Sequence, residues 1–204
     1  MKNILFDSFQ LILKILDSLF PKSDNTIIFP IDSYKDYKDN RRFLFDSLSK
    51  YQKIDCVILF YSKQDVTSPR HVNFYTLKGL IYWLRSRYIV IDHGTSDIPF
   101  SGSLDYNRRK IINVWHGISL KNLGYRIKDK NVLTMKSEFE KYSSMICSST
   151  LDFLAMQSCF RKSKKDMWMT GLPRNDLLLL NESQIPNDLK SGLNWIENKL
   201  NQRK

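Results

Sequence analysis

YIVIDHG at residues 88–94 and KIINVWHG at residues 110–117 follow one pattern, a short apolar run that ends at a His-Gly pair. Both runs are rich in β-branched residues, which is typical of strands buried inside an α/β protein. A segment rich in Ser, Gly, Asp and Pro, residues 95–107, separates them. The two runs predict strands that each deliver a histidine to a loop.

The rest of the chain extends this pattern in both directions, with apolar runs alternating with segments of helical periodicity. Several short buried strands separated by helices predict an α/β fold with a Rossmann-like, mostly parallel sheet. Ligands of such sheets bind outside the carboxyl ends of the strands. Further strands are predicted at residues 26–29, 54–61, 144–147 and 166–169, and helices at 40–51, 77–84, 135–142 and 149–160.

The two ends of the chain are predicted to be helical. Apolar residues recur at helical spacing through residues 5–20, with polar residues opposite them, so residues 1–21 predict an N-terminal amphipathic helix. Lys14 and Asp17 make it too polar to cross a bilayer. Packing on the domain and contact with a membrane surface are equally compatible with this pattern. We expect residues 22–180 to form the main domain and residues 181–204 a helical tail, the start of a further domain.

The net charge of +11 is concentrated in two stretches. Residues 106–141 carry +6 and residues 161–174 carry +4. Such concentration favours a polyanionic partner, which could be a phosphate-containing substrate, anionic lipid or nucleic acid. The three cysteines stand singly, which predicts reduced thiols in a cytoplasmic protein, and the ligand spacing predicts no metal.

His116 is the first candidate for chemistry, because a parallel sheet would present its imidazole at a carboxyl end, where a general base is useful. A histidine satisfied by nearby backbone has the same local pattern, and His93 shares it. Lys121 and Arg126 follow His116 and could bind phosphate or form a solvated basic loop.

A second candidate group is Arg174-Asn175-Asp176, in a turn predicted to lead into a helix at Leu177. A helix amino terminus with an arginine beside it suits an anion. Asn175 or Asp176 could equally cap the helix.

These segments resemble the motifs of the CDP-glycerol:poly(glycerophosphate) glycerophosphotransferases, which make teichoic acids and related capsule polymers. WHGISLKNLG at residues 115–124 is similar to the family's Trp-His-Gly signature, with Ser119 in place of the usual proline and Asn122 in place of a lysine. GLPRND at residues 171–176 is similar to a second motif, with Leu172 in place of tyrosine. The stretch YKDN at residues 37–40 resembles the opening of the first domain.

The resemblance covers residues 26–180 and implies one half, the acceptor side, of a two-domain GT-B architecture. It implies transfer of glycerol phosphate from CDP-glycerol to a lipid-linked acceptor at the cytoplasmic side of the bacterial plasma membrane. His116 would be the general base, while Lys121, Arg126, Arg174, Asn175 and Asp176 would bind substrate phosphates. CDP-glycerol is the donor substrate, and no cofactor is expected. The second domain, which supplies the donor site, would lie outside these residues.

Three other interpretations remain open. The chain could be a non-catalytic module that binds the acceptor or a membrane and needs a separate donor-domain polypeptide. It could transfer ribitol phosphate or another polyol phosphate, because these residues do not distinguish the polyol. Nucleic-acid binding fits the charge, but no recognised motif or aromatic platform accompanies it, so we expect no nucleic acid partner.

Overall fold

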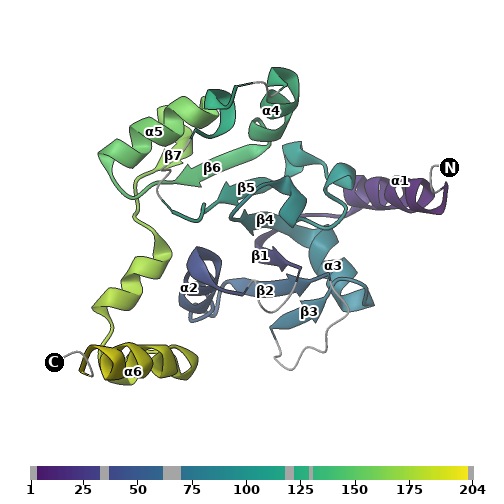
Figure 1. The fold of residues 1–204 in the computed structure, drawn as a ribbon. Helices are drawn as coiled ribbons and strands as arrows, with labels where there is room; N and C mark the ends of the chain where they lie inside the picture. The colour runs from purple at the N-terminus through teal and green to yellow at the C-terminus, as the bar shows by residue number, and fades with distance from the viewer. Residues whose placement is uncertain (1–3, 33–36, 62–69, 118–121, 129–130, 202–204) are drawn as a thin grey trace.

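A computed structural model describes residues 4–32, 37–61, 70–117, 122–128 and 131–201. Seven strands form one sheet in the order β3-β2-β1-β4-β5-β6-β7, and every neighbouring pair is parallel (Figure 1). The predicted α/β class and parallel sheet are therefore confirmed. The strands are β1 (Ser23–Ile31), β2 (Asp55–Phe60), β3 (His71–Asn73), β4 (Ser86–Ile91), β5 (Lys110–Asn113), β6 (Tyr142–Ile146) and β7 (Met167–Trp168).

The helices lie where periodicity predicts them, with small differences at their ends. Side-chain caps explain several of the starts: Thr76 accepts from the amide of Gly79 before α3, and Ser149 accepts from the amide of Asp152 before α5. The helices are α1 (Ile4–Leu19), α2 (Asp39–Leu48), α3 (Leu77–Arg85), α4 (Val132–Phe139), α5 (Thr150–Phe160) and α6 (Asn187–Asn201).

The two faces of the sheet are covered unequally. Alternate residues of β4 point to opposite faces, so Ile89 and Ile91 join one apolar cluster and Val90 joins the other. The cluster of Ile89 and Ile91 includes side chains from α1, α3 and α5, whereas α2 contributes Phe45 to the opposite cluster. The three cysteines are buried free thiols, as predicted.

Two parts of the chain differ from the sequence-based expectation. The three-residue edge strand β3 was not predicted, because it lacks a run long enough to show periodicity. The turn before Leu177 does not open an α-helix. It forms the 3₁₀ helix Pro173–Leu179, in which the amide of Leu180 donates to the carbonyl of Leu177.

A buried ionic cluster joins α1 to the sheet. Asp17 is fully buried, accepts a hydrogen bond from Lys22 at 2.6 Å, and is paired with the buried Arg109 just before β5. Arg108 donates to the carbonyls of Asp17 and Phe20 at the carboxyl end of α1, 3.0 Å each. Part of the positive charge counted in residues 106–141 is therefore structural and unavailable to a ligand.

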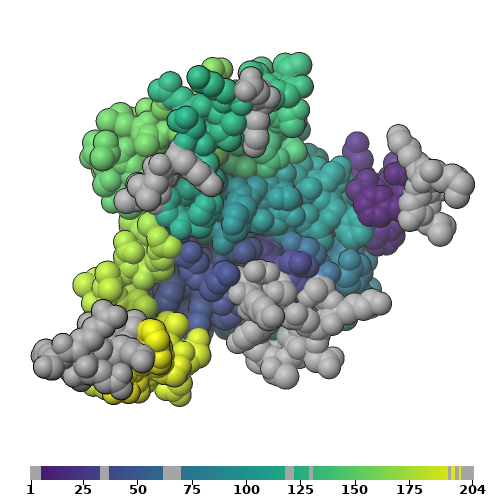
Figure 2. All heavy atoms as spheres, in the orientation of Figure 1, coloured from purple at the N-terminus to yellow at the C-terminus, as the bar shows by residue number. Residues whose placement is uncertain are grey.

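The exposed side of α1 carries a row of apolar side chains, so the helix both packs on the domain and presents apolar residues outward. Leu13 and Asp17 point inward, while Leu11, Ile15 and Leu19, four residues apart, are 60%, 52% and 72% exposed. In the space-filling view α1 protrudes at one side of the molecule (Figure 2). No helix in the described part of the chain is long and apolar enough to cross a membrane.

Candidate functional site

The two His-Gly segments meet at the carboxyl ends of two neighbouring inner strands of the sheet. Strands β4 and β5 are parallel neighbours, with Ile91 opposite Asn113, so their carboxyl ends lie side by side. The rings of His93 and His116 stack there, with centroids 4.8 Å apart and planes inclined by 23°. The chain runs outward from β1 to β3 and then returns to β4 on the other side of β1, so the strand order reverses between β1 and β4. The carboxyl end of β4 therefore adjoins this topological switch point, where α/β sheets bind ligands.

One ring nitrogen of His116 is already engaged. Its Nδ1 lies 3.1 Å from the backbone carbonyl oxygen of Asp92. A carbonyl can only accept, so Nδ1 carries the hydrogen and donates it, which leaves Nε2 as the basic nitrogen of the neutral ring. The other face of the ring stacks on Trp115, at a centroid distance of 4.4 Å. The exposed imidazole is thus held by neighbours, and no residue in the described part of the chain is hydrogen-bonded to its Nε2, which can act as a base.

The amino terminus of α2 connects the loops around His116. Asn40 is fully buried, and its amide donates to the carbonyls of Val114, at 3.1 Å, and Trp115, at 2.9 Å. Its side-chain oxygen accepts from the amide of Arg174, at 3.2 Å. Asn40 therefore joins the loop that carries His116 to the loop that carries Arg174.

The next residue of α2 ties the same helix to the end of β4. Arg41 donates to Asp92 Oδ2 at 2.8 Å and to the carbonyl of Pro30 at 2.6 Å. Burial raises the pKa of Asp92, although the charge of Arg41 opposes this. The positive charge of Arg41 therefore compensates the charge of the buried Asp92 carboxylate, which lies next to His93.

Arg174, one of the residues predicted to bind phosphate, lies beside His116. Its Nη1 donates to both carboxylate oxygens of Asp39, at 2.8 and 3.0 Å, and to the carbonyl of His116, at 3.0 Å. Gly117 has φ +146°, and a Cβ at that position would lie 3.1 Å from Arg174 Nη2. The glycine after the histidine therefore allows the guanidinium to approach the backbone closely.

A cavity of about 440 Å³ opens next to the stacked histidines. His93 and Trp115 are among its lining residues, and Leu123, Met135 and Phe139 belong to its apolar wall. Glu138, also in the lining, accepts from the amide and the hydroxyl of Thr95 at 2.6 Å each. The carboxylate of Glu138 is therefore already hydrogen-bonded, and the apolar wall suits an apolar or mixed ligand.

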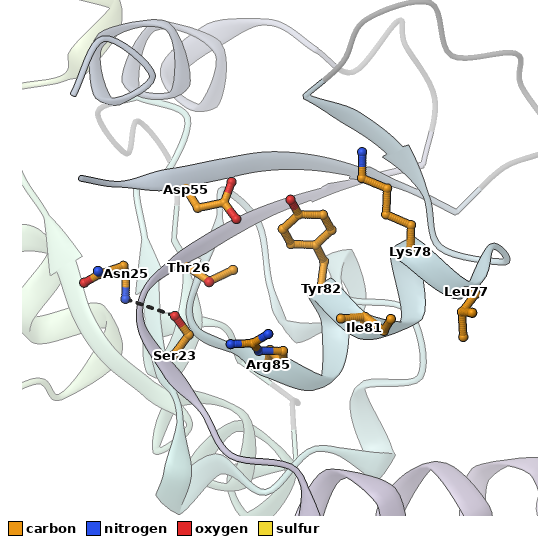
Figure 3. A pocket seen from close by; sticks show the side chains of 9 residues that line it. All are labelled: Ser23, Asn25, Thr26, Asp55, Leu77, Lys78, Ile81, Tyr82 and Arg85. Carbon is orange, nitrogen blue, oxygen red and sulfur yellow. Dashed lines mark hydrogen bonds between the residues drawn. The ribbon is translucent and has the colours of Figure 1, made fainter. Parts of the chain in front are cut away.

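A second cavity, of about 680 Å³, lies at the amino ends of the strands (Figure 3). It is lined by residues near the starts of β1 and β2, including Ser23 and Asp55, and by Tyr82 and Arg85 of α3. Burial raises the pKa of Tyr82, and the charge of Asp55 adds to the effect. This cavity is at the amino ends of the strands, away from both His-Gly segments.

Comparison with known proteins identifies the family. The sequence pattern of the CDP-glycerol:poly(glycerophosphate) glycerophosphotransferase family matches residues 12–200. The chain belongs to this family. The resemblance inferred from the Trp-His-Gly and GLPRND segments is confirmed.

Two curated relatives of the glycerophosphotransferase family are similar along most of this chain. A teichoic acid glycerol-phosphate transferase of Staphylococcus aureus is 24% identical over 208 residues, which cover 95% of this chain and 52% of the relative. A teichoic acid poly(glycerol phosphate) polymerase of Bacillus spizizenii is 25% identical, over 87% of this chain and 48% of its own length. The chain thus spans about half the length of the curated relatives it matches.

Solved structures of the wall teichoic acid polymerase TagF share the fold. One superposes with a TM-score of 0.64 at 19% identity, covering 93% of this chain and 48% of TagF. A TagF variant gives 0.66 at 20% identity over 98% of this chain. The fold of this chain therefore corresponds to about half of TagF.

The remaining predicted site residues of this family member are distributed as follows. Lys121 lies outside the described residues. Arg126 donates a hydrogen bond to the Ser158 hydroxyl of α5 at 2.9 Å, and this contact holds its side chain against that helix. Asn175 and Asp176 are exposed on the 3₁₀ helix, and neither occupies its N-cap, which is Leu172. An α-helix amino terminus that binds an anion therefore has no counterpart here, and the predicted capping role is wrong.

The residues that organise the site were largely missed from the sequence. Asn40 lies in the YKDN stretch that carries the family resemblance, which was the available signal for it. Asp39 lies in the same stretch, but its partner Arg174 is 135 residues away. Arg41 had no such signal, because it follows the stretch and its partner Asp92 is 51 residues away. Asp92 was visible only as the residue before His93.

Proposed function

We propose that this chain binds the glycerophosphate acceptor and supplies the general base, His116, for transfer of glycerol phosphate from CDP-glycerol. The observation that carries the proposal is the geometry of His116 within the family's Trp-His-Gly segment. Its Nδ1 donates to the carbonyl of Asp92, and its Nε2 has no hydrogen-bond partner among the residues that the structure describes. General-base help of this kind is worth about 10²–10⁴-fold in rate.

In this reaction His116 Nε2 accepts the proton of the acceptor's terminal hydroxyl. The hydroxyl oxygen attacks the phosphorus that bears glycerol, the new P–O bond forms, and the bond to the other phosphate breaks, so CMP leaves with the electron pair. Such a transfer depends chiefly on positioning and on neutralising phosphate charge. Among the described residues, Arg174 is the cation best placed to neutralise this charge, because it lies next to His116. Lys121 and Arg126 are proposed to bind further phosphates of the acceptor.

The choice of donor and acceptor rests on the relatives. The curated relatives are a glycerol-phosphate transferase and a poly(glycerol phosphate) polymerase, and a TagF variant has been solved after a soak with CDPG. Because the match covers about half of each relative, we propose that the donor site belongs to a second domain or a separate polypeptide. A non-catalytic acceptor-binding module is the second candidate, favoured by the same half-length match.

We also propose that α1 holds the protein at the cytoplasmic face of the plasma membrane. The support is its outward row of Leu11, Ile15 and Leu19, opposite the side that packs through Leu13. Apolar side chains on one face of a surface helix bind the boundary between headgroups and acyl chains. A lipid-linked acceptor would then reach the site from the membrane surface.

The test is CMP release from CDP-glycerol in the presence of membranes that carry a glycerophosphate acceptor. Wild type and His116→Ala are compared, each with and without a donor-side half taken from one of the relatives. We expect release that needs His116, and CDP-ribitol in a parallel reaction identifies the polyol. If neither protein releases CMP while acceptor binding persists, the non-catalytic module is correct. Equal release by both proteins would contradict the role of His116.

A further inference from the structure

His93 is a second imidazole at the carboxyl ends of β4 and β5, and the reaction described above gives it no role. Its ring stacks on His116, its side chain is 61% exposed, and it lines the 440 Å³ cavity. It is therefore open to a ligand on one side while in contact with the proposed base on the other.

The loop of His93 is fixed by hydrogen bonds from both directions. Asp97 Oδ2 accepts from the backbone amides of Asp92, at 3.2 Å, and of His93, at 3.1 Å. The side-chain amide of Asn113 donates to the carbonyl of His93 at 3.2 Å. An exposed side chain on a loop held in this way has little freedom left to lose when it binds a ligand.

The ring itself is oriented by a buried carboxylate. His93 Nδ1 lies 2.7 Å from Asp92 Oδ1, and the other oxygen of Asp92 accepts from Arg41. Since an ionised carboxylate can only accept, Nδ1 donates to it. Nε2 is then the nitrogen of His93 that remains for a ligand.

The same three side chains could suggest a cation site, since the ligand atoms of Asp92, His93 and Asp97 lie within 4.8 Å of one another. However, both oxygens of Asp92 and one oxygen of Asp97 already accept hydrogen bonds from Arg41, His93 and two amides. These carboxylates serve to position the imidazole.

We propose that His93 Nε2 donates a hydrogen bond to a phosphoryl oxygen of the substrate bound beside His116. In the imidazolium form both nitrogens donate, Nδ1 to Asp92 and Nε2 to the ligand. Only the identity of that phosphate rests on the function proposed above: it belongs to the glycerol phosphate end of the acceptor or to the diphosphate of the donor. His93 would then hold the phosphate beside the ring of His116, while Arg174 donates to the backbone carbonyl of His116.

Histidine-selective NMR tests this on the full chain, because the protein has three histidines. Glycerol 3-phosphate and CMP are titrated separately, as probes for the acceptor end and the donor. We expect the ring resonances of His93 and His116 to shift with at least one probe. His71, in the edge strand β3 and packed against Tyr37, should stay unchanged and serves as the internal reference. Unchanged His93 resonances with both probes would overturn the proposal.

Three substitutions separate donation from stacking. His93→Gln keeps an N–H near the position of Nε2, His93→Phe keeps a ring for His116 to stack on, and His93→Ala keeps neither. We expect the Phe and Ala variants to bind the active probe about 10- to 100-fold more weakly, the range for losing a hydrogen bond to a charged group, and the Gln variant to stay within about threefold of wild type. Binding retained by Phe and lost by Gln would show a stacking role and overturn the proposal. An unchanged His71 signal confirms that each variant is folded.

These measurements do not depend on turnover. Phosphate contact at His93 can be found even if the chain releases no CMP, and CMP release that is indifferent to His93→Ala would refute the contact while leaving the proposed function intact.

Discussion

Asn40 shows how one side chain can hold a site together without touching a substrate. It satisfies two carbonyls of the His116 loop and one amide of the Arg174 loop, and it is fully buried. Arg174 adds a direct link between the two loops, because its Nη1 donates to the carbonyl of His116 at 3.0 Å. The position of His116 therefore depends on a residue 76 positions earlier in the chain.

Replacing Asn40 with Ala should lower the free energy of unfolding by about 2 kcal/mol or more, because buried polar groups lose their partners. It should also weaken acceptor binding at temperatures where the protein is still folded, since both loops are released. Urea unfolding and a binding titration measure the two effects. Asn25→Ala, at an exposed position, is the matched control and should change stability by less than about 0.5 kcal/mol. Equal stability of the Asn40 and Asn25 variants would contradict this account.

The sequence was informative at residue scale where a local pattern and the site coincide. A strand followed by His-Gly placed His116 and His93 at the carboxyl edge, and the parallel pairing of β4 and β5 explains why they meet. The partners of these histidines could not be predicted, because the contacts of Arg41 with Asp92 and of Arg174 with Asp39 form only when distant segments assemble.

At the scale of elements, periodicity predicted those strands and helices that are long enough to show it. The helical spacing of residues 5–20 corresponds to α1, but it could not show that Asp17, on the polar side of the pattern, would be as fully buried as Leu13. Its partner Arg109 comes from the segment before β5. The run of leucines at 177–180 suggested an α-helix, whereas the hydrogen bonds around it are of the 3₁₀ type.

The cluster of Asp17, Lys22 and Arg109 makes stability sensitive to acid. Burial opposes ionisation of Asp17, but hydrogen bonds and charge from Arg109, with Lys22 and the amide of Asp105, hold its pKa below the ordinary value. Burial also lowers the pKa of Lys22, so the two partners do not shift in a complementary way, and the acid response belongs to Asp17. A lowered pKa in the folded state means that this stabilisation is present above pH ~4 and is lost as pH falls through the folded value.

Asp17→Asn should therefore destabilise the protein at neutral pH by about 3 kcal/mol, because Arg109 would remain buried without a charge partner. The difference from wild type should begin to shrink below about pH 4, where the unfolded wild type binds the proton, and should go on shrinking as pH falls toward the lower pKa of Asp17 in the folded state. Chemical unfolding from pH 7 to pH 3 measures it. A difference that is absent at pH 7, or that grows in acid, would contradict this assignment.

For the whole molecule, α1 and the site have to face a common surface if the acceptor is membrane-bound. Replacing Leu11, Ile15 and Leu19 together with Gln should lower binding to phosphatidylglycerol vesicles by at least about tenfold, because three exposed apolar side chains no longer enter the lipid. Vesicle co-sedimentation measures this. Leu178→Gln with Leu179→Gln is the control, since both leucines are 83% exposed on a different element. Vesicle binding by the α1 variant equal to that of wild type would exclude α1 as the membrane contact.

The most direct test of the whole account is calorimetric binding of a short glycerol phosphate oligomer to the isolated chain. Wild type is compared with two variants. Arg174→Ala removes the arginine beside His116, and Arg85→Ala removes an arginine of the cavity at the amino ends of the strands. We predict that wild type binds, that the Arg174 variant binds about 10- to 100-fold more weakly, and that the Arg85 variant is unchanged. No binding by wild type, or a loss at Arg85 with none at Arg174, would contradict an acceptor site at the carboxyl ends of β4 and β5.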